Sequence, residues 1–471
     1  MKLLKILYND KEKVYLIYKW VAENIEYDYE KYKNKESVEC EPAQVLINKK
    51  TVCSGYARLF TKLLTCLEYP ELNIKNIIGH SKGLGYDIEK EITDADSDHE
   101  WNAVKIEDNW CLIDVTWGAG STVSEEFQKS YTEYYLCTPP NQFVRSHLPR
   151  KTEEEFQFLK NPIDIPTFKN LAPTTTKFFE YGFVSITNDK AIQNICGEGK
   201  IVLKYETSIR PLLFLKIKKD TTEFKWIMEE KITNGYDIIF SINEVGIYDL
   251  EVGANIDKGN SYTKIVNIKV KCDIAPEIKK IYPKFTLDYK KEDDIKLISP
   301  INNDLIQGNK YNFEIQSSNY EQLYILVDNE YILMDKDGTK FIEKDVMIHG
   351  ESVKISYPSS NYYYPLVEYS TSGTTVEFPQ TSPTPFKKRL ESPLKNTLII
   401  GNQYDFTVIS DTEYNIVIYY NGKVDAQLDK NNNIYTKRIT IESSADNKLM
   451  IMCGPFEGGT YKSMYTYNLS N

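Results

Sequence analysis

The sequence predicts an α+β multidomain chain, with a helix-containing N-terminal domain followed by three all-β sandwich domains. Two segments near the N-terminus have apolar residues at helical spacing. After about residue 166 helical patterns almost vanish, and short alternating segments separated by Asn, Asp, Gly and Pro continue to the C-terminus. A long segment that begins at Leu297 also recurs 93 residues later, at Leu390, which indicates two copies of one domain.

Bulk properties exclude several classes of protein. A chain of 471 residues is long enough for about three or four domains. Its net charge of −11 argues against nucleic acid and anionic membranes as partners. No run of about 18 apolar residues occurs, so we expect no membrane span. The start, with Lys2 and Lys5, is too interrupted for a signal peptide. Eight sparse cysteines without a CxxC motif predict reduced thiols and a cytoplasmic location.

The N-terminal domain is expected to contain two helices and a hairpin. Apolar residues repeat with helical spacing over residues 12–25 and again over 53–67. Residues 101–106 and 110–115 resemble two strands of a hairpin that turns around Asp108-Asn109.

The remaining chain is expected to form the three sandwiches. Residues 246–252 alternate in the manner of a late strand of the first one. In the repeat, Tyr311 and Phe313 match Tyr404 and Phe406, and both rings of each copy are expected in a core. A proline-rich segment, 378–388, would open the last copy. The predicted domains are 1–165 with the helices, 166–277 as the first sandwich, 278–377 as repeat copy 1 and 378–471 as repeat copy 2.

Cys53 is the candidate nucleophile. It lies in "KKTVCSGYARLF", at the first turn of the second predicted helix. The N–H groups of that turn and the helix dipole favour a thiolate there. Cys66 is late in the same helix and Cys111 is inside a strand, so neither has this setting.

A thiolate nucleophile needs a base and a group that orients the base. His99 and Asp114 can fill these roles, because alternation places them on the same face of the hairpin. With a tight turn at Asp108-Asn109, Asp114 opposes Ala103 and lies roughly 13 Å from His99 along the strands. A wider turn centred near Ile106-Glu107 would set the two opposite each other, and the sequence leaves both registers open.

Five separated motifs, in order, resemble one known family. They are "WVAENIEYD", "VCSGYARLF", "IIGHSKGLGY", "HEWNAVKIEDNWCLIDVTWGAG" and "YYLCTPPNQFVRSHLP". Together they are similar to the transglutaminase-like domain of the kyphoscoliosis peptidase family, over about residues 12–165. The resemblance implies a papain-like core with a Cys-His-Asp triad on Cys53, His99 and Asp114, and immunoglobulin-like β-domains behind it. Some members of this family have lost the triad and act as cytoskeletal or cytokinesis scaffolds.

Other residues near the triad are weaker candidates. Trp101, Trp110 and Trp117 are expected to form an apolar wall that keeps the site dry. The backbone N–H of Cys53 is one expected oxyanion donor, and Gln44 is a candidate for the second. Asp94, Asp96 and Asp98 have the spacing of a calcium loop, but its Gly and Glu are missing, so we interpret the segment as a solvated acidic loop. His80 and His147 are interpreted as structural, and we expect no metal and no cofactor.

Two functions remain open. The first is a cysteine-dependent enzyme that forms a Cys53 thioester with a protein substrate and resolves it with water as a peptidase or with a lysine amine as a transamidase. Cytoskeletal proteins are candidate substrates. The second is a non-catalytic cytoskeleton- or cytokinesis-associated scaffold, with a vestigial core and β-domains for partner binding. The intact triad favours the enzyme. The oligomeric state and the need for calcium cannot be predicted from the sequence.

Overall fold

The computed structural model describes residues 9–83, 86–123, 125–257, 259–277, 279–292, 294–328, 330–359, 362–373, 379–382, 388–410, 412–442, 447–454 and 460–470. The chain groups into two compact units, 1–194 with 203–214 and 247–271, and 195–202 with 215–246 and 272–471. Among the described residues, no helix is long and apolar enough to cross a membrane.

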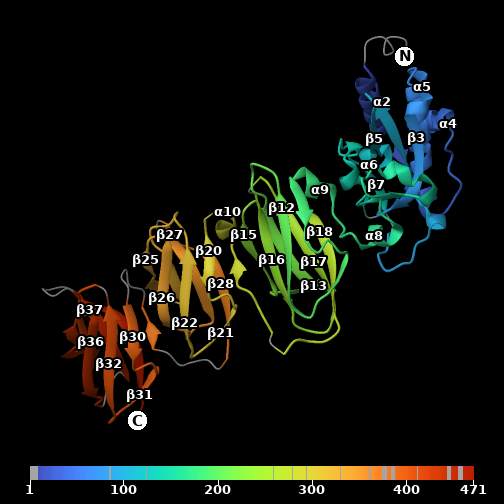
Figure 1. The fold of residues 1–471 in the computed structure, drawn as a ribbon. Helices are drawn as coiled ribbons and strands as arrows, with labels where there is room; N and C mark the ends of the chain where they lie inside the picture. The colour runs from blue at the N-terminus through green and yellow to red at the C-terminus, as the bar shows by residue number, and fades with distance from the viewer. Residues whose placement is uncertain are drawn as a thin grey trace. The chain divides into compact units, whose positions relative to one another are not determined.

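The N-terminal domain is built on a five-stranded antiparallel sheet of order β8-β5-β4-β3-β9 (Figure 1). Its strands are β3 (Ile74–Ser81), β4 (His99–Ile106), β5 (Asn109–Ile113), β8 (Leu136–Thr138) and β9 (His147–Pro149). Two further pairs are β1 (Glu26–Tyr27) with β2 (Lys50–Thr51), and β6 (Gly120–Val123) with β7 (Glu126–Lys129). The helices are α2 (Asp10–Asn24), α3 (Tyr29–Lys33), α4 (Pro42–Asn48), α5 (Cys53–Cys66), α6 (Val115–Ala119), α7 (Pro140–Phe143), α8 (Ile165–Asn170) and α9 (Thr176–Glu180).

Both predicted helices form, as α2 and α5. A capping box fixes the start of α2: Asn9 accepts from the N–H of Glu12, and Glu12 accepts from the N–H of Asn9. The apolar stripes of the two helices share one core with the inner faces of β4 and β5. The opposite face of the sheet packs a second cluster around Trp101 and Phe143. The sheet is therefore covered on both faces, and the start of α5 is held against it.

The β4–β5 hairpin has a register that the sequence did not predict. Ile106 pairs with Asn109, so the turn residues are Glu107 and Asp108, with φ of 47° and 66°. Positive φ at both central residues is typical of a type I′ hairpin turn. Neither the turn at Asp108-Asn109 nor the wider one is present. The strands end in register at Asn102 opposite Ile113, and α6 begins directly afterwards.

Residues 183–272 form two sheets. The four-stranded sheet has the order β10 (Phe183–Ile186), β12 (Gly197–Tyr205), β16 (Gly235–Ile242), β15 (Ile227–Ile232). The five-stranded sheet has the order β11 (Ile192–Asn194), β18 (Thr263–Cys272), β17 (Gly246–Asn255), β13 (Leu212–Lys219), β14 (Thr222–Phe224). The predicted late strand is β17, in which Tyr248, Leu250 and Val252 are buried and alternate with more exposed residues.

The two repeat copies have the same strand order. In copy 1, β19 (Lys284–Phe285), β28 (Tyr362–Ser372), β27 (Ser352–Ser359), β23 (Tyr324–Val327) and β24 (Glu330–Leu333) form one sheet with β21 (Asp304–Ile306), next to helix α10 (Leu287–Lys291). The other sheet has β20 (Lys296–Ser299), β22 (Lys310–Gln316), β26 (Lys340–Met347) and β25 (Asp335–Asp337). Copy 2 repeats this with β29 (Gln380–Thr381), β38 (Lys462–Ser470), β37 (Lys448–Gly454), β33 (Asn415–Tyr420), β34 (Lys423–Gln427) and β31 (Thr397–Ile399), and with β30 (Lys388–Ser392), β32 (Gln403–Ser410), β36 (Ile434–Thr440) and β35 (Asp429–Asn431).

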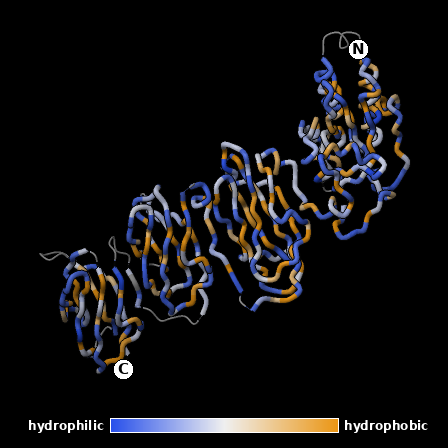
Figure 2. The backbone as a smooth tube through the Cα atoms, in the orientation of Figure 1, coloured by the Kyte–Doolittle hydropathy of each residue, from blue (hydrophilic) through white to orange (hydrophobic). Residues whose placement is uncertain are grey.

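Each copy has its own core, made by side chains of both sheets. Figure 2 shows the alternation of apolar and polar residues along these strands. Phe313 and Phe406 are fully buried, each edge-on to a tyrosine of the facing sheet at ring distances of 5.6 and 5.7 Å. Tyr311 and Tyr404 are only partly buried, and the hydroxyl of each accepts a backbone N–H from five residues upstream. The prediction holds for the phenylalanines and only in part for the tyrosines.

The boundaries near residues 166, 278 and 378 stay predictions. Residue 378 and residues 383–387 of the proline-rich segment lie outside the described residues.

Candidate active site

Cys53 is the first residue of α5 and is half-buried. No side chain caps this helix terminus. The helix starts very close to β2, because a Cβ on Gly55 would lie 1.9 Å from Oγ1 of the buried Thr51. Only a glycine allows this approach, which seats the first turn of α5, and Cys53 with it, against the domain core.

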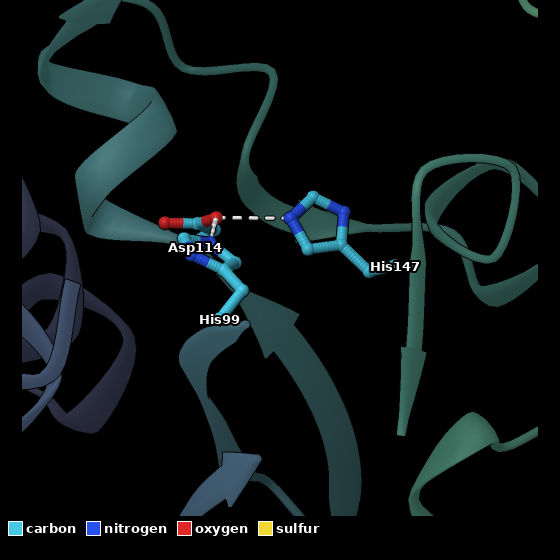
Figure 3. Close-up of side chains that lie close together, drawn as sticks. All are labelled: His99, Asp114 and His147. Carbon is cyan, nitrogen blue, oxygen red and sulfur yellow. Dashed lines mark hydrogen bonds and ion pairs between the residues drawn. The ribbon is translucent and has the colours of Figure 1, made fainter. Parts of the chain in front are cut away.

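His99 and Asp114 meet at the end of the hairpin. His99 is the first residue of β4, and Asp114 directly follows β5 as the N-cap of α6. Nε2 of His99 lies 2.7 Å from Oδ2 of Asp114 (Figure 3). The Cys53 side chain is near enough to raise the pKa of the imidazole. Since Nε2 is used by Asp114, Nδ1 is the ring nitrogen that remains for Cys53. The structure therefore brings the three predicted residues together.

A second histidine, which the sequence analysis interpreted as structural, shares the same carboxylate. His147, the first residue of β9, has Nε2 at 3.0 Å from Oδ2 of Asp114 (Figure 3). Its Nδ1 lies 2.9 Å from Oγ of Ser146. A carboxylate only accepts, so His147 donates from Nε2 and the Ser146 hydroxyl donates to Nδ1. Oδ1 of Asp114 accepts the backbone N–H of Trp117 at 3.0 Å, so three donors converge on one buried carboxylate.

The charges of this group follow from burial and from these contacts. Burial raises the pKa of Asp114, but the charge of His99 and the hydrogen bonds from both imidazoles outweigh it, and the pKa lies well below its usual range. For His99, burial lowers the pKa, but Asp114 and Cys53 raise it by more than burial lowers it. The pKa of His99 therefore lies well above its usual range. Burial lowers the pKa of His147 below its ordinary value. The result is an ionised Asp114 between a charged His99 and a neutral His147.

Aromatic rings surround the two imidazoles. Trp101 is buried, with its ring 6.0 Å from that of His99 and 5.3 Å from that of His147. Trp117 lies 5.8 Å from His99 and 4.4 Å from His147. Trp110 makes no ring contact with either imidazole among the described residues; it stacks at 5.9 Å on Phe158 and packs against the same apolar cluster as Trp101. Two of the three tryptophans thus contact both imidazoles.

The other predicted residues are not among the donors that bind Asp114. Gln44 is exposed on α4, and its oxyanion role stays a prediction.

The carboxylates of the acidic loop, Asp94, Asp96 and Asp98, accept hydrogen bonds from backbone N–H groups. Asp98 accepts the N–H of Ser81 at 2.8 Å, Asp94 accepts that of Lys151, and Asp96 caps a short turn with Thr93. The three acidic residues thus hold the local backbone, which agrees with a structural role for this loop.

A cavity of about 750 Å³ reaches the imidazole of His99. Its wall carries mainly hydroxyl and aromatic side chains, among them Trp117 and Tyr135. Tyr27 and Tyr32 also line it, whereas Cys53 is not among its lining residues. Lys82 lines the cavity too, and burial together with the charge of Arg145 lowers its pKa to about 7. The cavity is large enough for a peptide segment.

The same group is the one place, within the described ranges, where ligand-type atoms could hold a metal ion. The atoms of His99, Asp114 and His147 lie within 4.8 Å of one another. Both Nε2 atoms, however, carry the protons that bond Oδ2, so neither offers a lone pair to a metal. The arrangement fits a hydrogen-bonded carboxylate better than a metal centre.

Comparison with known proteins defines the class. A family model described as the transglutaminase-like superfamily matches residues 4–115, and a model described as a KY-like, immunoglobulin-like domain matches residues 165–283. The chain therefore contains a transglutaminase-like domain followed by a KY-like immunoglobulin-like domain within a large β-rich region. The first match includes Cys53, His99 and Asp114 and ends before His147.

The kyphoscoliosis peptidases of Mus musculus and Homo sapiens are both 30% identical to this chain over 281 residues. Each match covers 58% of this chain and 40% of the relative, so the chain spans less than half the length of these curated relatives. Hillarin of Drosophila melanogaster is 29% identical over 153 residues, covering 30% of this chain and 18% of Hillarin. The predicted resemblance to the kyphoscoliosis peptidase family is confirmed by these matches.

Proposed function

We propose that the chain is a cysteine-dependent enzyme in which Cys53 forms a thioester with a carbonyl of a protein substrate. The observation that carries this proposal is the 2.7 Å contact between His99 and the buried Asp114, with Cys53 near enough to raise the pKa of the same imidazole. This is the arrangement of nucleophile, base and orienting acid on which thiol acyl transfer depends.

The chemistry follows from these positions. The Cys53 thiolate attacks the carbonyl carbon, and a C–S bond forms while the carbonyl oxygen becomes an oxyanion. The N–H groups at the uncapped start of α5 can stabilise that oxyanion, with Gln44 as the predicted second donor. The charged His99 gives its proton to the departing amine, and the C–N bond breaks. His99 then takes a proton from the incoming water or lysine amine, which releases Cys53.

Asp114 and His147 act through His99. Asp114 holds the imidazole in the tautomer that leaves Nδ1 toward the thiol, and stabilises its positive charge. His147 fixes the carboxylate from the other side, so we propose it as a positioning residue. Trp101 and Trp117 support both by packing against the imidazoles.

Labelling with a peptide that carries a thiol-reactive electrophile tests the proposal. We expect the full-length chain to be labelled at Cys53, and a Cys53→Ala variant to lose the label. Casein with a fluorescent primary amine then separates the two reactions: casein fragments indicate a peptidase, and fluorescent casein indicates a transamidase. A chain whose Cys53 reacts no faster than in an unfolded control would contradict the proposal.

A second candidate function is a non-catalytic scaffold associated with the cytoskeleton or with cytokinesis. The β-rich region from residue 166 onward, nearly two-thirds of the chain, supports it, because immunoglobulin-like domains commonly bind proteins. A Cys53→Ala variant that binds protein partners as the wild type does, combined with no labelling of Cys53, would favour the scaffold.

A further inference from the structure

Cys111 and Cys137 meet across two neighbouring strands of the N-terminal sheet. β5 and β8 are antiparallel, and the register shifts by one residue within their pairing. The pairs on either side of the shift are Leu112 with Thr138 and Ile113 with Leu136. Cys137 is thus the extra residue of a β-bulge, with a φ of 59°. Cys111 precedes the bulge on the facing strand, and the two side chains are near enough to shift each other's pKa.

The surroundings of this pair favour reaction with an oxidant. Cys137 is an exposed residue, and Cys111 is half-buried. The interaction with Cys137 lowers the pKa of Cys111 to about 7 against the effect of burial, and the charge of Lys11 lowers it further. The same interaction raises the pKa of Cys137. These shifts favour the thiolate form at Cys111 and the thiol form at Cys137.

We propose that Cys111 and Cys137 form a peroxide-sensitive modification site, at which the two thiols are reversibly oxidised to a disulfide. The Cys111 thiolate attacks one oxygen of hydrogen peroxide, which gives a sulfenic acid and hydroxide. The Cys137 thiol then attacks that sulfur, the S–S bond forms and water leaves. Peroxide is reduced by two electrons and the two thiols are oxidised by two electrons. A dithiol reductant reverses the step.

The site is separate from the proposed nucleophile and close to its acid partner. Cys111 lies in β5, three residues before Asp114, which directly follows this strand. The backbone N–H of Asp114 also donates to the carbonyl of Tyr135, two residues before Cys137. Oxidation would place a covalent bond between the two segments that hold Asp114. The proposal does not depend on whether Cys53 is catalytic.

The experiment uses the full-length chain with Cys53→Ser, which removes the proposed catalytic thiol. After treatment with hydrogen peroxide and blocking with N-ethylmaleimide, non-reduced peptides are mapped by mass spectrometry. We expect a Cys111–Cys137 disulfide that forms at least about tenfold faster than Cys66 is oxidised and disappears with dithiothreitol. Mapping by peptide matters because Cys196 and Cys272 form a second contacting pair.

Two variants sharpen the result. Cys137→Ser, a conservative change at an exposed position, should let dimedone trap Cys111 as the sulfenic acid. Cys66→Ser is the matched control, since Cys66 is also half-buried in this domain, and it should leave the disulfide unchanged. Blocking of Cys111 and Cys137 by N-ethylmaleimide after peroxide treatment, or oxidation of Cys66 at an equal rate, would overturn the proposal.

Discussion

His99 and His147 bind the same oxygen of Asp114, at 2.7 and 3.0 Å, from two strands that lie on either side of β3. The two imidazoles differ in charge, because the pKa of His99 is raised and that of His147 is lowered. The Asp114 carboxylate thus pairs with the charged imidazole of His99 and accepts a second hydrogen bond from the neutral imidazole of His147. This relationship leads to the first two predictions.

Replacing His147 with alanine should slow the alkylation of Cys53 as well as destabilise the domain. The change leaves a buried carboxylate without one donor, which costs about 1–3 kcal/mol of unfolding free energy. His147→Gln keeps a donor and should recover part of the rate. The matched control is His349→Gln, because His349 also pairs with a buried carboxylate, that of Glu330 at 2.9 Å, in repeat copy 1. Equal rates of Cys53 alkylation at each pH in wild type and His147→Ala would show that His147 does not position Asp114 and His99.

Replacing Asp114 with asparagine should change the pH dependence of Cys53 alkylation. Asp114 raises the pKa of His99, so its loss lets the imidazole become neutral at lower pH. A neutral His99 stabilises the thiolate less, and we expect the acidic limb of the alkylation profile to move to higher pH. Asp114→Asn should fold nearly normally, whereas Asp114→Ala should lose about 1–3 kcal/mol. Superimposable profiles for wild type and Asp114→Asn would exclude Asp114 from the triad.

Acid should remove the stability that Asp114 contributes. Its pKa in the folded chain lies below the value of about 3.9 expected in the unfolded chain. The unfolded state therefore binds more protons in this range, and stability falls as the pH drops below about 4 toward the folded pKa. Urea unfolding of wild type and Asp114→Asn should show a difference that shrinks from about pH 6 to about pH 3. A difference that grows toward acid would show the sign to be wrong.

Phe406→Ala and Phe313→Ala should each unfold one repeat copy. Both rings are fully buried in separate cores, and such a truncation typically costs about 3–5 kcal/mol. Limited proteolysis near residues 378–388 should release a folded fragment of about 90 residues from wild type, and Phe406→Ala should melt it. Cys53 alkylation should stay unchanged in both variants. Loss of Cys53 labelling in Phe406→Ala would show the domain division to be wrong.

Much of the fold could be predicted because single segments determine it. The helical spacing in α2 and α5 reflects one buried face, and the repeat shows its two copies directly in the residue order. The hairpin register could not be predicted, because Glu107 and Asp108 take positive φ where Asp108 and Asn109 were the more favourable turn pair. This shift of the turn by one residue changes which β4 residue lies opposite Asp114, and so the distance between Asp114 and His99.

His147 was missed for a different reason. It lies 33 residues beyond Asp114, and a lone histidine at the start of a short strand has no local pattern that indicates a partner. The available signal was the motif "YYLCTPPNQFVRSHLP", which contains this residue and belongs to the same domain. Strand β9 brings it to the site only through pairing with β3, a contact that no spacing in the sequence reveals.

The reactivity of Cys53 tests the central proposal most directly. The full-length chain is treated with limiting iodoacetamide near neutral pH, and the label at each of the eight cysteines is measured by mass spectrometry over time. We expect Cys53 to react fastest, and to slow in His99→Ala to the rate of Cys66, the lone thiol at the other end of α5. A Cys53 that reacts no faster than Cys66 or Cys137 in the wild-type chain would contradict the catalytic account.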